Sequence, residues 1–171
     1  MRLTVHGKHF HLDGRPHFLR TVTYGPFPET SDHSPEKDLP QIRSAGFDSV
    51  RVYALPDRHL LDHAAQNKLI IIATHAWGHG CDFITENPSL LDQARRDLTA
   101  WLESHKDHPG LGAILVGNEI PSDMARWMTP WKVNQALDGL IRACQKVIPS
   151  IPVGYANFPT TEYLEPPSAD S

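Results

Sequence analysis

The sequence predicts an α/β fold in which parallel strands alternate with helices. Short runs of apolar, mostly β-branched residues recur along the 171 residues, and segments with helical apolar periodicity separate them. Strands that are connected through helices pair in parallel, with right-handed crossovers. A sheet of this kind is either an open doubly wound sheet or a closed barrel.

The strands are predicted from the apolar runs and their turn residues. At the N-terminus, residues 3–5 and 9–12 flank Gly7, and Asp13-Gly14 provides a hairpin turn before Arg15-Pro16. Five further strands are expected at residues 18–24, 49–53, 69–74, 112–116 and 153–157. The run at 112–116 is almost wholly apolar, which suits a strand that is buried on both faces.

Helices are predicted between these strands. Ser34 with Pro35 is a typical helix start, and Gly46 ends that helix; Pro56-Asp57 opens the next one. Residues 88–106 give the clearest helical periodicity. A second long helix is expected over 130–147, with these residues on one face: Val133, Leu137, Leu140, Ile141 and Cys144.

The turn after the first parallel strand favours a barrel over an open nucleotide-binding sheet. An open sheet of that type has a glycine-rich turn here, but residues 24–28 read YGPFP, and prolines lack the amide donors that a phosphate needs. We therefore predict a (β/α)8 TIM-barrel type. A complete barrel takes roughly 250 residues, so we expect a single domain over residues 1–171, truncated after about five strands.

A five-strand part of a barrel exposes two sheet edges, which invite pairing. We therefore expect either a homodimer or a missing C-terminal half-barrel as a partner. The formal net charge of −4 does not indicate a nucleic-acid-binding protein. No apolar run has the length of a membrane span, and the N-terminus lacks the apolar core of a signal peptide, so a cytoplasmic location is expected.

Polar and aromatic residues follow the predicted strands at their carboxyl ends, which share one face in a parallel α/β protein. The candidate site residues are Tyr24, Arg51, His75, Trp77, Asn118, Glu119, Tyr155 and Asn157. Aromatic faces stack on sugar rings, and Arg, His and Asn donate hydrogen bonds to hydroxyls. A carboxylic acid among them indicates glycosidic-bond chemistry on a carbohydrate substrate.

Asn118 and Glu119 are the centre of this pattern, because they follow an almost wholly apolar strand at the point where it opens to solvent. A carboxyl group at the edge of a core, beside an amide, suits a general acid. In the alternative interpretation, the two residues only cap the next helix. Likewise, Tyr24 and Trp77 could simply close the barrel top, and Arg51 could be a structural partner of a carboxylate.

The segment HAWGHGCD offers His75, His79, Cys81 and Asp82 as potential metal ligands. Their spacing matches no common zinc pattern, so no metal is predicted. No cofactor is predicted either, because acid/base glycosidase chemistry needs none.

Several motifs resemble the glycoside hydrolases of clan A, in particular the barrel of the β-galactosidase and β-glucuronidase family. VHGKHFHLDGRPHFLRTVTYGPF resembles the first strand with its hairpin, DLPQIRSAGFDSVRVY the first helix and second strand, and HPGLGAILVGNEIP the fourth strand with its Asn-Glu pair. TYGPFPE, RVYALPDRHLLDHA, GNEIP and YANFPTTEYLEPP resemble hydrolase-like domains that precede a membrane-bound processive glycosyltransferase in some bacterial proteins.

The resemblance implies a retaining O-glycosyl hydrolase in which Glu119 is the general acid/base, Asn118 binds the 2-hydroxyl of the sugar and Arg51 supports the nucleophile. The family's nucleophile lies at the end of the seventh strand, which the predicted five strands do not include. Glu162 and Glu165 do not match that position. The alternative is a non-catalytic carbohydrate-binding or accessory domain of a glycosyltransferase fusion.

Overall fold

The computed structural model describes residues 1–76 and 81–170. Its strands are β1 (Leu3–His6), β2 (His9–Leu12), β3 (Arg15–Pro16), β4 (Thr21–Thr23), β5 (Ser49–Val52), β6 (Ile70–Thr74), β7 (Leu111–Asn118) and β8 (Val153–Ala156). Its helices are α1 (Pro35–Ser44), α2 (Arg58–Gln66), α3 (Ser89–His105), α4 (Ser122–Trp127) and α5 (Pro130–Val147). In the described part of the chain, no helix combines the length and the hydrophobicity of a membrane span.

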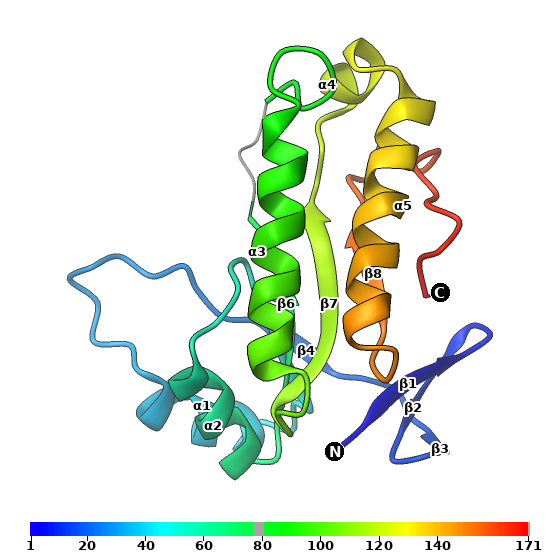
Figure 1. The fold of residues 1–171 in the computed structure, drawn as a ribbon. Coiled ribbons are helices and arrows are strands. Elements are labelled where there is room, and N and C mark those ends of the chain that lie inside the picture. The colour runs from blue at the N-terminus through cyan, green and yellow to red at the C-terminus, as the bar shows by residue number, and fades with distance from the viewer. Residues whose placement is uncertain (77–80, 171) are drawn as a thin grey trace.

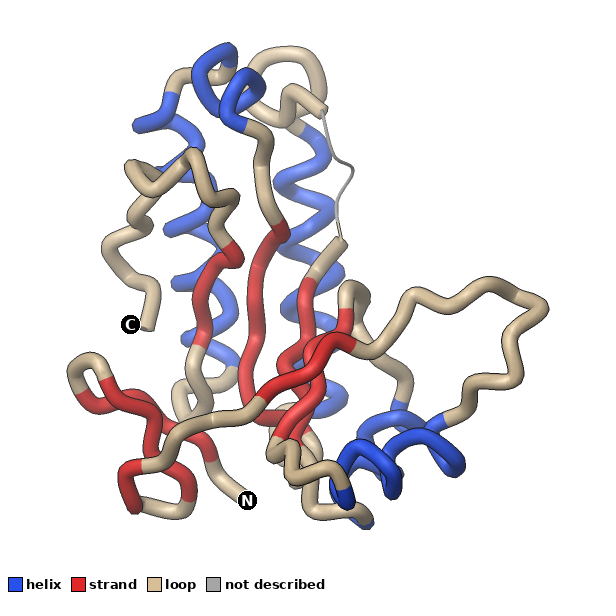
Figure 2. Tube along the Cα trace, turned by 180° about the vertical axis from the view of Figure 1, so that it is seen from behind, coloured by secondary structure: helices blue, strands red, loops and turns tan. Residues whose placement is uncertain are grey.

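The main sheet has five parallel strands in the order β4-β5-β6-β7-β8, which is also their order in the sequence. A doubly wound sheet reverses its strand order at a switch point, and a barrel does not. Helices α3 and α5 cover one face of the sheet (Figure 1), and the opposite face carries no helix (Figure 2). The predicted partial TIM-barrel type is confirmed.

The N-terminal hairpin forms a separate antiparallel sheet, β1-β2-β3. Its turn places Asp13 and Gly14 at positive φ, as the Asp-Gly pair predicts. Leu3 is fully buried in a small cluster with Ile70 and Ala113. The hairpin therefore packs against β6 and β7 at the end of the sheet opposite to their carboxyl ends (Figure 2).

The predicted strand at residues 18–24 is wrong at its start. Only Thr21–Thr23 pair with β5, in the register Thr21↔Ser49 to Thr23↔Arg51. Because β5 begins at Ser49, residues 18–20 have no ladder partner, and the side chain of Phe18 is 87% exposed. The β-branched residues are those of β4 itself, and the apolar residues Phe18 and Leu19 before it have no neighbouring strand to pair with.

The edge of β8 is less open than expected. The backbone N–H of Val153 donates to Oδ2 of Asp170 at 2.9 Å, and the N–H of Asp170 donates to the carbonyl of Val153 at 3.0 Å. Gln145 of α5 also donates to the carbonyl of Ser168 at 2.7 Å. The C-terminal segment therefore lies along α5 and β8 (Figure 1) and covers part of this edge.

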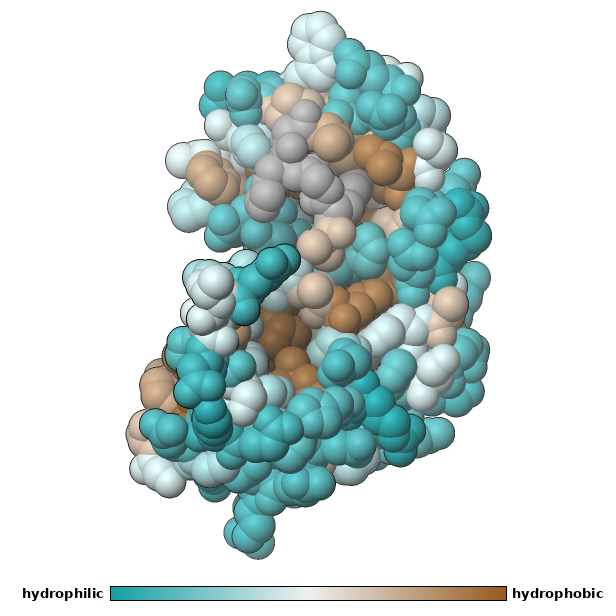
Figure 3. Space-filling model, turned by 90° about the vertical axis from the view of Figure 1, so that its left-hand side faces the viewer, coloured by the Kyte–Doolittle hydropathy of each residue, from teal (hydrophilic) through white to brown (hydrophobic). Residues whose placement is uncertain are grey.

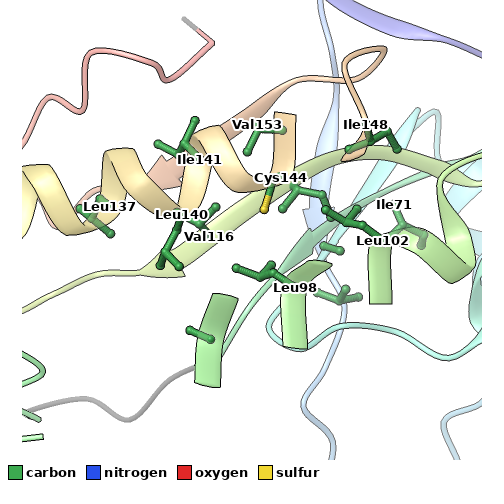
Figure 4. Close-up of a cluster of buried hydrophobic side chains, with 14 of the residues drawn as sticks. Ile71, Leu98, Leu102, Val116, Leu137, Leu140, Ile141, Cys144, Ile148 and Val153 are labelled. Carbon is green, nitrogen blue, oxygen red and sulfur yellow. The ribbon is translucent and has the colours of Figure 1, made fainter. Parts of the chain in front are cut away.

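The core lies between the sheet and its helices (Figure 4). Leu98 and Leu102 of α3 meet Leu140 of α5 and the outward-facing residues of the strands, such as Val116. The apolar face predicted for 130–147 is confirmed, because these five residues are all buried: Val133, Leu137, Leu140, Ile141 and Cys144. Helix α5 is thus held by burial of one continuous stripe.

Truncation of Leu140 to alanine is expected to lower the free energy of unfolding by about 2–5 kcal/mol, because it leaves a cavity between α5 and α3. Denaturant unfolding monitored by circular dichroism measures this change. The matched control is Phe18→Ala, which removes an exposed apolar side chain and is expected to shift stability by about 0.5 kcal/mol at most. Equal effects of the two substitutions would contradict the described core.

Asp48, directly before β5, is buried and is the centre of a cluster of charged side chains. Its carboxylate contacts His17 Nε2 at 3.0 Å, Arg20 Nε at 3.3 Å and Arg43 Nη1 at 3.2 Å. Burial alone raises the pKa of Asp48, but the hydrogen bonds from His17 and Arg20 outweigh it and bring the pKa down to about 2.

A carboxyl group with a lowered pKa stabilises the fold above its ordinary pKa, and this contribution is lost as the pH falls through the pKa of the folded state. Asp48 is therefore expected to contribute about 2 kcal/mol at neutral pH, lost between about pH 4 and pH 2. Urea unfolding of the protein and of Asp48→Asn as a function of pH measures it. The difference in the free energy of unfolding between the two proteins should shrink as the pH falls from about 4 to about 2. A difference independent of pH would contradict the stabilising role of the Asp48 carboxylate.

Candidate functional site

The carboxyl ends of the five parallel strands bring together most of the residues predicted from the sequence. Arg51 lies on β5, His75 directly follows β6, and Asn118 ends β7 with Glu119 next in the chain. Tyr155 lies on β8. Trp77 falls outside the described residues.

The chain leaves β7 through an unusual backbone conformation. Glu119 has φ of +42°, in the left-handed region that non-glycine residues rarely adopt. Two contacts to β8 hold it there: the N–H of Glu119 donates to the carbonyl of Ala156 at 2.9 Å, and the N–H of Ile120 donates to the hydroxyl of Tyr155 at 2.7 Å. Such outliers persist where surrounding contacts impose them, and they are concentrated at functional sites.

The capping interpretation of Asn118 and Glu119 is wrong. Helix α4 begins at Ser122 with Pro121 as its N-cap residue, and it has no side-chain capping hydrogen bond. The side chain of Asn118 is engaged elsewhere, since its Oδ1 accepts a hydrogen bond from Nη2 of Arg51. Within the described residues, no hydrogen bond or ion pair fixes the carboxylate of Glu119, which is half-buried.

Arg51 contacts two side chains at the strand ends, Asn118 and Tyr53. Besides donating to Asn118, its guanidinium carbon lies 4.9 Å from the ring centre of Tyr53, a cation–π contact. Its Nε is buried and has no partner among the described residues. A guanidinium with an unpaired donor can bind a carboxylate or another acceptor.

Tyr155 and Glu119 are electrostatically coupled. Burial raises the pKa of Tyr155 to about 12, and the negative charge of Glu119 adds to this rise. Tyr155 is therefore a neutral phenol at physiological pH. Its oxygen accepts from the N–H of Ile120, so its own proton stays free for a further acceptor.

His75, which directly follows β6, carries a largely buried imidazole. Its side chain is 10% exposed, and burial lowers the pKa of the imidazole, although the carboxylate of Asp97 on α3, 3.7 Å from Nε2, opposes that effect. Its Nδ1 and the hydroxyl of neighbouring Thr74 are buried without a partner among the described residues. Sequence patterns alone missed Asp97 and Thr74, because one lies in a charged helix face and the other in an apolar strand.

Tyr24 and Asn157 are used in local structure. The hydroxyl of Tyr24 donates to Asp38 of α1 at 3.0 Å. The pKa of Tyr24 is raised, mainly by burial and also by this hydrogen bond. The amide of Asn157 donates to the carbonyl of Leu164 at 3.2 Å and accepts from the hydroxyl of Thr161 at 2.6 Å. These two side chains hold the β4–α1 loop and the C-terminal segment, respectively.

Of the cavities lined by described residues, two that adjoin the strand ends bear on the site. One of about 720 Å³ lies along β7, β8 and the C-terminal segment, and its lining includes Leu115, Tyr155, Asn157 and Glu165. The other, of about 260 Å³, is mostly apolar and is lined by these residues: Tyr24, Gly25, Pro26, Phe27, Val52, Tyr53, Ala54, Pro56 and Leu60. Apolar side chains gather in a hollow on the side of the molecule from which the β4–α1 loop projects (Figure 3).

Of the potential metal ligands in HAWGHGCD, His79 lies outside the described residues. The carboxylate of Asp82 is occupied by structural contacts: it accepts from the N–H groups of Ile84 and Thr85 at 2.9 and 2.8 Å, and from Nε1 of Trp127 at 3.0 Å. These bonds tie the segment after β6 to α4.

No family model matches the chain, and no curated protein matches it. Solved structures do. β-Glucuronidase from Ruminococcus gnavus in complex with D-glucuronic acid aligns with a TM-score of 0.78 at 18% identity, over 98% of this chain and 29% of that one. β-Glucuronidase 3 from Bacteroides uniformis aligns with a TM-score of 0.71 at 20% identity, over 88% of this chain and 20% of that one.

The β-glucuronidase from Parabacteroides merdae gives a similar result, with a TM-score of 0.71 at 17% identity and the same coverages of 88% and 20%. This chain spans a fifth to less than a third of the length of these three structures. At sequence identities this low, the similarity is evidence of a shared fold. The chain therefore has the fold of a part of a β-glucuronidase-type glycoside hydrolase barrel.

Proposed function

We propose that this chain is the acid/base-bearing part of a retaining O-glycoside hydrolase catalytic domain. Glu119 gives its proton to the leaving oxygen, Asn118 binds a hydroxyl beside the reacting carbon, and Arg51 orients Asn118. The observation that carries the proposal is the contact between Arg51 and Asn118 beside the left-handed Glu119, at the strand ends of a barrel-type sheet. The fold shared with β-glucuronidases supports the same chemistry.

Retaining hydrolysis needs a second carboxyl group about 5 Å from the first. Among the described residues, Glu119 is the sole carboxylate that directly follows a strand of the five-stranded sheet. The free Nε of Arg51 is a suitable partner for the second carboxylate. We therefore infer that the nucleophile comes from outside this sheet, and that the chain by itself binds the glycoside and supplies its proton donor.

Azide can replace the second carboxylate in a test of this role. It attacks the anomeric carbon, the bond from that carbon to the aryl oxygen breaks, and the proton of Glu119 moves to the departing oxygen. The products are a glycosyl azide and 4-nitrophenol. We expect this chain to release 4-nitrophenol from 4-nitrophenyl β-D-glucuronide with azide and not without it. The same assay with 4-nitrophenyl β-D-galactoside tests whether the chain prefers one of the two sugars.

If 4-nitrophenol were released with azide no faster in the presence of the chain than in its absence, the proposal would be contradicted. Release without azide would show that a carboxylate of this chain acts as nucleophile, and Glu165 beside Tyr155 would then be the first residue to replace. Saturable binding without release would identify a carbohydrate-binding domain instead.

A further inference from the structure

Two histidines and a glutamate form a cluster on the outer helices, away from the strand ends. His59 and His63 are four residues apart on α2, so they share one face of that helix. Glu36 lies in the first turn of α1. Its Oε1 is 2.7 Å from Nε2 of His59 and 3.3 Å from Nε2 of His63. The two imidazole rings meet edge to face, with their centres 4.6 Å apart.

These three ligand atoms have the spacing of a metal site. All of them lie within 4.8 Å of one another. A tetrahedral zinc ion with bonds of about 2.0–2.1 Å separates its ligand atoms by roughly 3.3 Å, so side-chain rotations alone bring the three atoms onto one ion. We propose that Glu36, His59 and His63 bind a divalent transition metal of the zinc class, with water as the fourth ligand.

The donor set selects the kind of metal. Two imidazoles and one carboxylate suit zinc, cobalt, nickel or copper, whereas magnesium and calcium prefer oxygen ligands alone. The side chains of Glu36, His59 and His63 are 47%, 55% and 22% exposed, so an ion can enter without unfolding. As plain surface ion pairs these contacts would contribute little to stability. A bound ion, in contrast, stabilises the folded state by mass action.

The site joins α1 to α2, which pack against each other (Figure 1). Both helices support the β4–α1 corner: Asp38 of α1 accepts the hydroxyl of Tyr24, and Leu60 of α2 lines the apolar cavity beside Tyr24. The metal therefore acts as a clamp on the helices that hold this cavity.

Titration of the full chain with Co²⁺ tests the site, because cobalt reports its geometry by visible absorption. We expect one ion per chain, a tetrahedral spectrum and no thiolate charge-transfer band. Zn²⁺ should displace the cobalt and raise the melting temperature by about 5–10 °C at 100 times the dissociation constant. Each of His59→Ala, His63→Ala and Glu36→Gln should weaken binding about tenfold or more.

The matched control is the double variant His6→Ala/His11→Ala, which removes another close histidine pair, with ring centres 4.4 Å apart on the hairpin. It should bind like the unchanged chain. The proposal is overturned by the absence of stoichiometric binding, by unchanged affinity in the His59 and His63 variants, by loss of binding in the hairpin control, or by a thiolate band, which would locate the ion at a cysteine. Circular dichroism of each variant verifies that it is folded.

Discussion

Replacing Glu119 by glutamine is expected to reduce azide-supported release of 4-nitrophenol by about 10²–10⁴-fold, because the departing oxygen loses its proton donor. Glutamine has the same shape as glutamate, and no described residue pairs with the Glu119 carboxylate. Binding of the glycoside and stability should therefore stay unchanged. Absorbance of nitrophenol gives the rate, and calorimetric titration gives the affinity.

The leaving group provides an internal check on this result. From a 2,4-dinitrophenyl glycoside, 2,4-dinitrophenolate leaves without needing a proton. Its release should therefore depend much less on Glu119. Glu162→Gln is the matched control, since this glutamate is exposed on the C-terminal segment. If E119Q released 4-nitrophenol at the original rate, Glu119 would not be the general acid.

Replacing Arg51 by alanine is expected to weaken glycoside binding about tenfold or more and to lower the free energy of unfolding by about 1–3 kcal/mol. Arg51 donates to Oδ1 of Asn118, so its removal leaves that oxygen without a partner and frees the amide to rotate. Calorimetric titration with the β-D-glucuronide and urea unfolding measure the two effects.

Arg142→Ala is a suitable control, because Arg142 pairs with Asp138 within α5 and is mostly exposed. It should change neither quantity appreciably. Arg51→Lys separates charge from geometry: lysine keeps the charge but lacks the planar fork. If R51A bound the glycoside as tightly as the unchanged chain, Arg51 and Asn118 would not form a sugar-binding pair.

The fold could be predicted from the sequence because its signals are local. Apolar runs and helical periodicity give the order of elements, and the order of parallel strands follows from the connections. The positions of Arg51, His75, Asn118 and Tyr155 at one end of the sheet follow from that topology, since each stands at or near the carboxyl end of a parallel strand.

Contacts between distant segments could not be predicted in this way. Nothing local indicates that Asp97 approaches His75, or that Asp170 pairs with the edge of β8. The sequence predicts too long a strand at β4 for the same reason, since the length of a strand depends on its neighbour. Asn157 stands at a strand end, yet its amide is used by Thr161 and Leu164, which follow it in the chain.

The left-handed conformation of Glu119 also escapes sequence reasoning, because glutamate has no preference for it. It arises from two hydrogen bonds to β8, a strand whose position depends on the whole sheet. This is the feature that distinguishes the end of β7 from an ordinary strand-to-helix connection.

Amide NMR spectra during a titration with 4-nitrophenyl β-D-glucuronide test whether the strand ends bind a glycoside. We expect saturable shifts at the backbone N–H groups of Glu119 and Ile120 and at the ends of β5, β6 and β8, all with one dissociation constant. Shifts confined to the apolar cavity beside Tyr24, or no shifts at all, would contradict a glycoside site at the strand ends.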